Sequence, residues 1–151
     1  MVPTDFPLDE ASFAATVLAF EDGTLPLAVW RQHQTHLIVS LWYLRQYPLA
    51  AATERIRTGI QRYNTAHGIA QTPDGGYHET ITQAFIHLIR YHVTQTDPAM
   101  PWPELVDGLV AAYGGTRTLL DYYSRDCLMS WTARTSWVEP DVRPLPAALG
   151  T

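Results

Sequence analysis

Apolar residues recur at helical spacing along most of this chain, and no segment shows the strict apolar–polar alternation of a half-buried strand. Phe13, Val17 and Phe20 form one such row. A longer row contains Trp30, His33, Leu37, Leu41 and Leu44. Because side chains three or four residues apart share one face of a helix, each row can cover a common core. The spacing therefore predicts an all-α fold.

Proline and glycine residues divide this pattern into separate helices. The predicted helices span residues 9–20, 27–46, 49–66, 78–93, 103–113 and 116–127. Within 27–46 we expect a short turn before the main helix, and prolines 140, 144 and 146 predict an extended tail over about 135–151. The 151 residues suit a single domain, 1–151, with one core. We predict a bundle of about five to six helices with an extended proline-rich C-terminal tail.

The charged residues exclude several classes of function. All ten basic residues are arginines, so no lysine can form a Schiff base or complete a phosphate-binding GxxxxGK[ST] loop. The formal charge of −5 predicts no nucleic-acid partner and no membrane partner, since both surfaces attract clustered positive charge. A lone Cys127 excludes intrachain disulfides, and the acidic N-terminal segment does not resemble a secretion signal. We expect a cytoplasmic protein.

Three histidines have the spacing and setting of metal ligands. His33 and His36 lie three residues apart on one predicted helix, where neighbouring Cβ atoms are roughly 5–6 Å apart. His78 begins another helix and could supply a third ligand. Three protein ligands and an open position for water are typical of catalytic zinc sites. The pattern predicts a divalent metal ion, zinc, with iron(II) as the alternative; ordinary structural histidines remain the other interpretation.

Glu79, next to His78, is the predicted catalytic residue. It could be the general base for metal-bound water, a fourth ligand, or an acid stabilised by the helix dipole. Ser40 and Thr82 lie one turn beyond His36 and His78, and their small polar side chains would leave space beside the imidazoles. The predicted substrate pocket consists of Trp42, Tyr43, Tyr63, Tyr77 and Thr82.

Three motifs carry a resemblance to an uncharacterised family of small helical bacterial proteins. They are WxxHxxHL at 30–37, YHETIT at 77–82, and YYSRDCLMSxxAR with WVEPDxRPLP over 122–146. The resemblance singles out His33, His36, His78 and Glu79. The chain is more loosely similar to DinB and YfiT-like bundles, which hold a metal with three histidines and include predicted hydrolases and thiol transferases. In those bundles the lone histidine comes first and an HxxxH pair last, so the likeness is an analogy of site design.

These features favour a metal-dependent hydrolase that acts on a small-molecule ester, amide or phosphoester through metal-activated water. One alternative is a non-haem iron enzyme that uses oxygen, with Glu79 completing the ligand set. Another is a non-catalytic helical binding protein with structural histidines. The expected partner is a small-molecule substrate, and the sequence leaves a homodimer open.

Overall fold

Helices form all the regular secondary structure in the computed structural model, which describes residues 10–115 and 117–146. This confirms the predicted all-α class. An isolated bridge between Thr72 and Gly75 is the β-type pairing found in this part of the chain. The longer helices are α1 (Glu10–Asp22), α3 (His33–Gln46), α4 (Leu49–Ala66), α5 (Glu79–Thr94) and α6 (Trp102–Tyr113). The shorter ones are α2 (Leu27–Trp30), η1 (Thr118–Asp121), α7 (Arg125–Leu128) and α8 (Trp131–Thr135).

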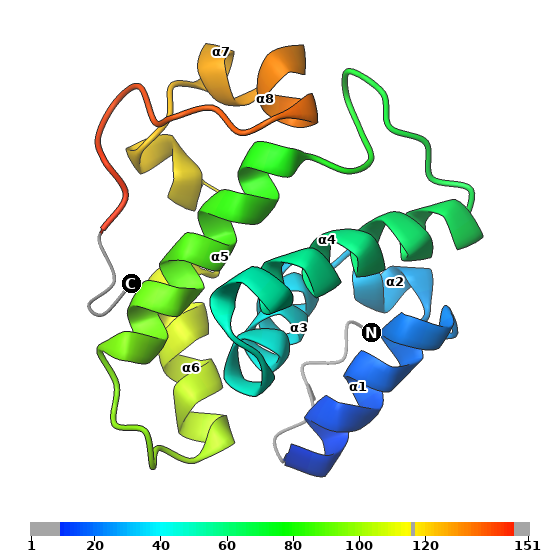
Figure 1. The fold of residues 1–151 in the computed structure, drawn as a ribbon, viewed down its shortest axis with the longest axis vertical. Helices are drawn as coiled ribbons and strands as arrows, with labels where there is room; N and C mark the ends of the chain where they lie inside the picture. The colour runs from blue at the N-terminus through cyan, green and yellow to red at the C-terminus, as the bar shows by residue number, and fades with distance from the viewer. Residues whose placement is uncertain (1–9, 116, 147–151) are drawn as a thin grey trace.

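Helix α3 is the central element, because it packs against α1, α4, α5 and α6. Leu37, Ile38 and Leu41 on α3 are fully buried. Helix α4 lies in front of α3 in Figure 1, and the segment between α4 and α5 arcs outward before α5 crosses the molecule. The N-terminal end of α5 lies beside α7 and α8 (Figure 1). Three helices, α3, α4 and α5, therefore meet around one interior region.

Helices α1 and α4 approach closely at Gly59. A Cβ atom added at Gly59 would lie 2.7 Å from Cε2 and 2.9 Å from Cζ of Phe20, closer than real carbon contacts. Phe20 itself is fully buried and stacks on Trp30 and Tyr63. The ring has little room to move away, so glycine is required here by packing.

We expect Gly59→Ala to destabilise the fold, although alanine is the better helix former by about 1 kcal/mol. Overpacking against Phe20 should lower the free energy of unfolding by about 1–3 kcal/mol. Urea denaturation followed by circular dichroism measures this loss. Thr58→Ala, on the exposed neighbouring position, is the control and should change stability by no more than about 0.5 kcal/mol. An unchanged or raised midpoint for Gly59→Ala would contradict the close approach.

The predicted helix over 116–127 is wrong. The chain instead forms the short 3-10 helix η1, a turn, and then the separate helix α7. The Ser124 side chain accepts a hydrogen bond from the Cys127 backbone N–H at 3.1 Å and so begins α7 anew. Ser124 donates two hydrogen bonds to the Asp141 carboxylate, from its backbone N–H at 2.7 Å and from its hydroxyl at 2.6 Å. Capping chemistry therefore divides the region into short pieces.

The described part of the tail, residues 136–146, contains no helix or strand, bends at 141–143 and packs on the bundle. The Tyr123 hydroxyl donates to the Val138 carbonyl at 2.7 Å, and the Val142 N–H donates to the Tyr122 carbonyl at 2.9 Å. Trp137 packs on the apolar cluster beneath. The predicted helix start at Asp9 and the end of the tail at 147–151 lie outside the described residues.

Candidate functional site

A cleft lies where α3, α4 and α5 meet, and it has two chambers. The outer chamber has a volume of about 430 Å³ and opens to solvent, within the ~300–1,000 Å³ range of small-molecule sites. The inner chamber has a volume of about 80 Å³ and lies deeper between the helices. The residues that line both chambers are Trp30, His36, Ile60, Ile81 and Thr82. Because the two chambers share these walls, they lie next to each other in the same cleft.

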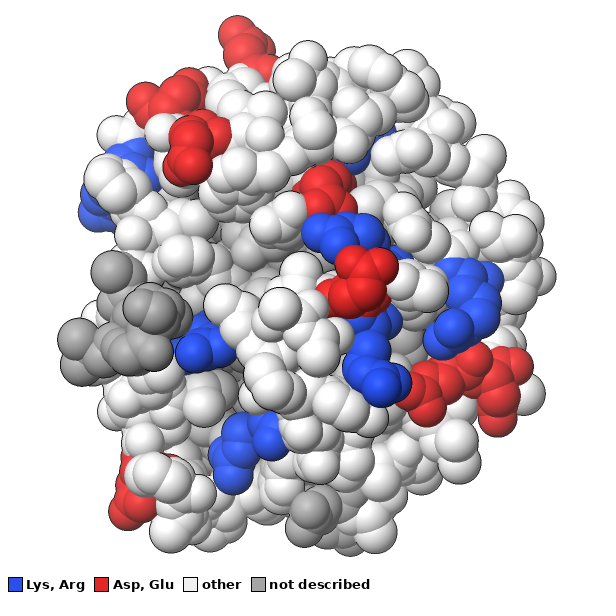
Figure 2. All heavy atoms as spheres, viewed as in Figure 1, with Lys and Arg blue, Asp and Glu red and all other residues white. Residues whose placement is uncertain are grey.

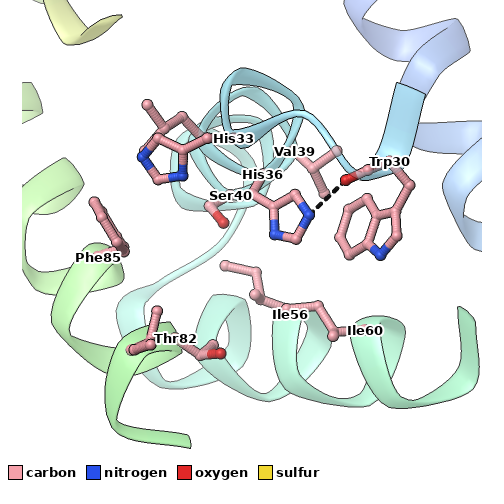
Figure 3. Close-up of a pocket in the computed structure, with 11 residues that line it drawn as sticks. Trp30, His33, His36, Val39, Ser40, Ile56, Ile60, Thr82 and Phe85 are labelled. Carbon is pink, nitrogen blue, oxygen red and sulfur yellow. Dashed lines mark hydrogen bonds between the residues drawn. The ribbon is translucent and has the colours of Figure 1, made fainter. Parts of the chain in front are cut away.

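The inner chamber is mostly apolar. Figure 3 shows α3 on one side and α4 on the other, with Ile56 and Ile60 facing His36 and with Thr82 and Phe85 coming from α5. Ser40 adds one hydroxyl to these walls. Ser40 and Thr82, which were predicted to leave space beside the imidazoles, both line this chamber.

The segment between α4 and α5 forms the outer wall of the cleft. Gly76 adopts φ +82°, and a Cβ atom there would lie 2.4 Å from the Ala70 carbonyl oxygen. Only glycine fits such a turn without strain. The turn brings Tyr77 and His78 to the cleft, which Asn64 of α4 also lines. A tight turn thus forms part of the wall of the outer chamber.

All three predicted metal ligands donate a hydrogen bond to a carbonyl of the last residue in a helix. His33 Nε2 bonds the Tyr113 oxygen at 3.1 Å, at the end of α6. His36 Nε2 bonds the Trp30 oxygen at 2.6 Å, at the end of α2 (Figure 3). His78 Nε2 bonds the Leu128 oxygen at 2.7 Å, at the end of α7. Carbonyls at helix ends lack partners within their own helix, so these imidazoles satisfy them.

The arrangement does not fit a three-histidine metal site. His78 Nδ1 accepts the Ile81 N–H at 3.1 Å and caps α5, so both nitrogens of His78 are engaged. The rings of His33 and His36 point in different directions, toward Phe85 and toward Trp30 (Figure 3). Across residues 10–115 and 117–146, no group of three or more His, Cys, Asp or Glu side chains is placed to hold a metal ion. The predicted ligand set is therefore not assembled here.

His36 nevertheless contributes a polar atom to the cleft. Because a carbonyl oxygen can only accept, Nε2 carries the proton and Nδ1 keeps its lone pair. Burial is the main reason that the pKa of His36 falls to about 4, and the nearby His33 lowers it further. The hydrogen bond to the Trp30 carbonyl acts in the opposite direction and raises the pKa, but by less. The ring is neutral at pH 7. Its Nδ1 makes no hydrogen bond within the described part of the chain, so it can accept one from a ligand.

Glu79, the predicted catalytic residue, lies in a hydrogen-bond network between α4 and α5. Arg57 donates from Nε to Oε1 at 2.9 Å and from Nη2 to Oε2 at 2.7 Å, while Tyr77 and Gln83 donate to the same carboxylate. Burial favours a higher pKa for Glu79, but these donors outweigh it and hold the pKa at about 2. Such a carboxylate is a weak base with its lone pairs occupied. The contacts assign Glu79 to holding the two helices together.

The structure places two of the five predicted pocket residues at the cleft. Tyr77 and Thr82 line the outer chamber. Trp42 stacks on Trp102 at 5.6 Å, and Tyr43 donates its hydroxyl to Glu21 at 2.5 Å, both away from the cleft. Tyr63 is fully buried and donates to the Leu25 carbonyl at 2.6 Å. These three aromatic residues belong to the core and its edge because their rows on α3 and α4 face α1 and α6.

Two buried polar residues of the cleft were missed from the sequence, Asn64 and Arg134. Asn64 is 7% exposed, and its side-chain amide forms no hydrogen bond within the described residues. Arg134 is 4% exposed and comes from α8, far along the chain from the other lining residues. Asn64 follows the buried Tyr63 in a helix that otherwise looks amphipathic, which is a weak signal. The position of Arg134 depends on tertiary packing that no local pattern shows.

Charges of both signs share the surface near this site. Arginine and acidic side chains lie interspersed over the face shown in Figure 2, which contains no broad basic area. The ion pairs of Arg57 with Glu54 and Glu79 belong to this mixture. None of the described helices has the length and apolar character needed to cross a bilayer.

Comparison with known proteins gives no relative: no family model, curated protein or solved structure matches this chain.

Proposed function

We propose that this protein binds a small organic molecule in the cleft between α3, α4 and α5. The observation that carries the proposal is a cleft of about 430 Å³ with polar groups that the fold leaves unused. Asn64 and His36 both line it, and the Asn64 amide and the His36 Nδ1 have no partner in the described residues. Buried polar groups are normally hydrogen-bonded, so buried polar groups without a partner, set among apolar side chains, indicate a ligand-binding site.

The apolar part of the walls fits an organic ligand, while Arg31, Asp74 and Arg134 add charged groups to the outer chamber. Trp30 offers an aromatic surface, while Ile60 and Ile81 are apolar and Thr82 has already donated its hydroxyl to the His78 carbonyl at 2.8 Å. The inner chamber has room for a few water-sized groups and is lined largely by carbon. A ligand with an apolar part that enters this chamber and a polar part that meets Asn64 matches both regions.

We expect Thr82→Leu to weaken ligand binding about tenfold or more, because the larger side chain fills the space that both chambers share. The measurement is a thermal-shift screen of neutral and charged aromatic and aliphatic fragments, since a ligand that binds only the folded state raises its melting temperature. Thr53→Leu is a matched control: Thr53 also donates to the carbonyl four residues earlier, at 2.8 Å, and does not line the cleft.

Equal shifts for both variants with every fragment that binds the wild type would contradict a ligand site in this cleft. Stabilisation lost in Thr82→Leu and retained in Thr53→Leu would support it. The two variants lose the same kind of local hydrogen bond, so a difference between them reflects the cleft alone.

The metal-dependent hydrolase stays a prediction of the sequence. His33 and His36 each keep one ring nitrogen without a partner in the described residues, whereas His78 does not. One equivalent of zinc in protein purified without chelators, lost in both His33→Ala and His78→Ala, would support the predicted metal site that the hydrolase requires. That result would also require His78 to leave the N-terminus of α5.

A further inference from the structure

Arg134 is a buried guanidinium with no carboxylate partner. It is 4% exposed and lines the outer chamber of the cleft. The ion pairs found among the described residues both belong to Arg57, with Glu54 and with Glu79. Burying a charge without a counter-charge is costly, so buried arginines are normally paired. Arg134 therefore lacks the partner that its surroundings favour.

The hydrogen bonds of Arg134 use one side of the guanidinium. Nη1 donates to the carbonyls of Gly75, Gly76 and Tyr77, at 3.0, 3.2 and 3.5 Å. Nε is buried and has no partner, and Nη2 donates to no atom of the described residues. The edge formed by Nε and Nη2 is thus left unused, while Nη1 fixes the turn that forms the wall of the cleft.

Arg57 of the same molecule uses the corresponding edge of its guanidinium, Nε and Nη2, to bind a carboxylate. Its Nε and Nη2 hold the two oxygens of the Glu79 carboxylate at 2.9 and 2.7 Å, while its Nη1 turns to Glu54. The fork geometry of a guanidinium matches a carboxylate through two parallel hydrogen bonds. In Arg134 the same two nitrogens have no carboxylate partner among the described residues.

We propose that the ligand is a small organic carboxylate whose anionic group pairs with the Nε and Nη2 edge of Arg134. This inference rests on the proposed function of the cleft. The apolar part of the molecule lies against Trp30 and Ile60 and extends toward the inner chamber. The carboxylate supplies the counter-charge that Arg134 lacks, in a chamber whose other charged lining residues are Arg31 and Asp74, one of each sign. The Asn64 amide gives the ligand a further donor.

The test compares acids with amides of the same shape. Calorimetry measures the binding of benzoate, phenylacetate and 4-phenylbutyrate, each beside its uncharged amide, to the full chain. We expect at least one acid to bind the wild type about tenfold more tightly than its amide. The preference should disappear in Arg134→Gln and persist in Arg62→Gln, whose exposed side chain lies outside the cleft.

Because Arg134 also pins the turn at residues 75–77, Arg134→Gln can lose its fold. A measurement on the wild type alone covers this case: the Nε–H resonance of Arg134 should shift in NMR spectra when 4-phenylbutyrate is added and stay in place with 4-phenylbutyramide. An unshifted resonance at saturation with the acid would overturn the role of Arg134.

The outcomes separate the two proposals. Acids and amides that bind the cleft equally in wild type and Arg134→Gln would overturn the carboxylate inference and leave the ligand site standing. No binding by any of the six compounds would overturn the carboxylate inference; the proposed function is then decided by the fragment screen with Thr82→Leu.

Discussion

Replacing Trp30 by alanine should lower the free energy of unfolding by about 3–5 kcal/mol, the largest effect we expect from a single substitution. Trp30 is 4% exposed and stacks on Phe20 and His36, with ring centroids 4.8 and 3.8 Å apart, and it also packs against Tyr63. Truncation removes a large buried aromatic surface and leaves a cavity beside the cleft. Since small domains are stable by only about 5–15 kcal/mol, the variant should be close to unfolding at 37 °C.

Urea denaturation followed by circular dichroism measures this loss, and the chain offers a matched control. Trp131 is 51% exposed, so Trp131→Ala should change stability by no more than about 0.5 kcal/mol. A similar small change in Trp30→Ala would show that the aromatic cluster of α1, α2 and α4 is not the core that the structure describes.

Glu79→Gln should lower the free energy of unfolding by about 2–4 kcal/mol at pH 7, because it removes the charge that holds the Arg57 guanidinium between α4 and α5. A glutamine can accept from one nitrogen of Arg57 but turns its own NH₂ toward the other donors. Glu54→Gln is the control: this second partner of Arg57 has a side chain that is 67% exposed, so its loss should cost at most about 0.5 kcal/mol.

The effect of Glu79→Gln should depend on pH. The folded-state pKa of about 2 lies below the ordinary value of 4.5, so ionised Glu79 stabilises the fold above about pH 4.5. This contribution declines as the pH falls toward 2 and the carboxylate gains a proton. Urea midpoints measured from pH 7 to pH 2 should show the gap between wild type and Glu79→Gln narrowing over that range. A gap that is constant with pH would contradict the ionic role of Glu79.

Much of the fold could be predicted because helical spacing and breaking residues coincide. The predicted helix 49–66 matches α4, since Pro48 and Gly68 lie just beyond its two ends. The separation of α2 from α3 was also predicted as a short turn before the main helix. The helix predicted over 116–127 was wrong because apolar spacing there outweighed the capping signal of Ser124. Ser124 and Ser130, the N-caps of α7 and α8, were the local signals that this region forms separate short helices.

The site could be predicted less well, and the histidines show why. His78 at the start of α5 has the position of a metal ligand and also that of an N-cap, and sequence does not distinguish the two uses. Partners of His33 and His78 lie 80 and 50 residues away, at the ends of α6 and α7. Helix ends that meet only in three dimensions set the role of each imidazole. Arg134 could not be predicted as a cleft residue for the same reason, because its hydrogen-bond partners come from the turn before α5.

The central claim, that the cleft between α3, α4 and α5 holds an organic ligand, is tested most directly by mapping binding on backbone amides. Two-dimensional ¹H–¹⁵N NMR spectra of the full chain would be recorded during titration with 4-phenylbutyrate. We predict the largest shifts at Asn64, Thr82 and Gly76, with Thr53 and the amides of α1 unchanged. Saturable binding whose shifts lie elsewhere, with these three amides unmoved, would contradict the account.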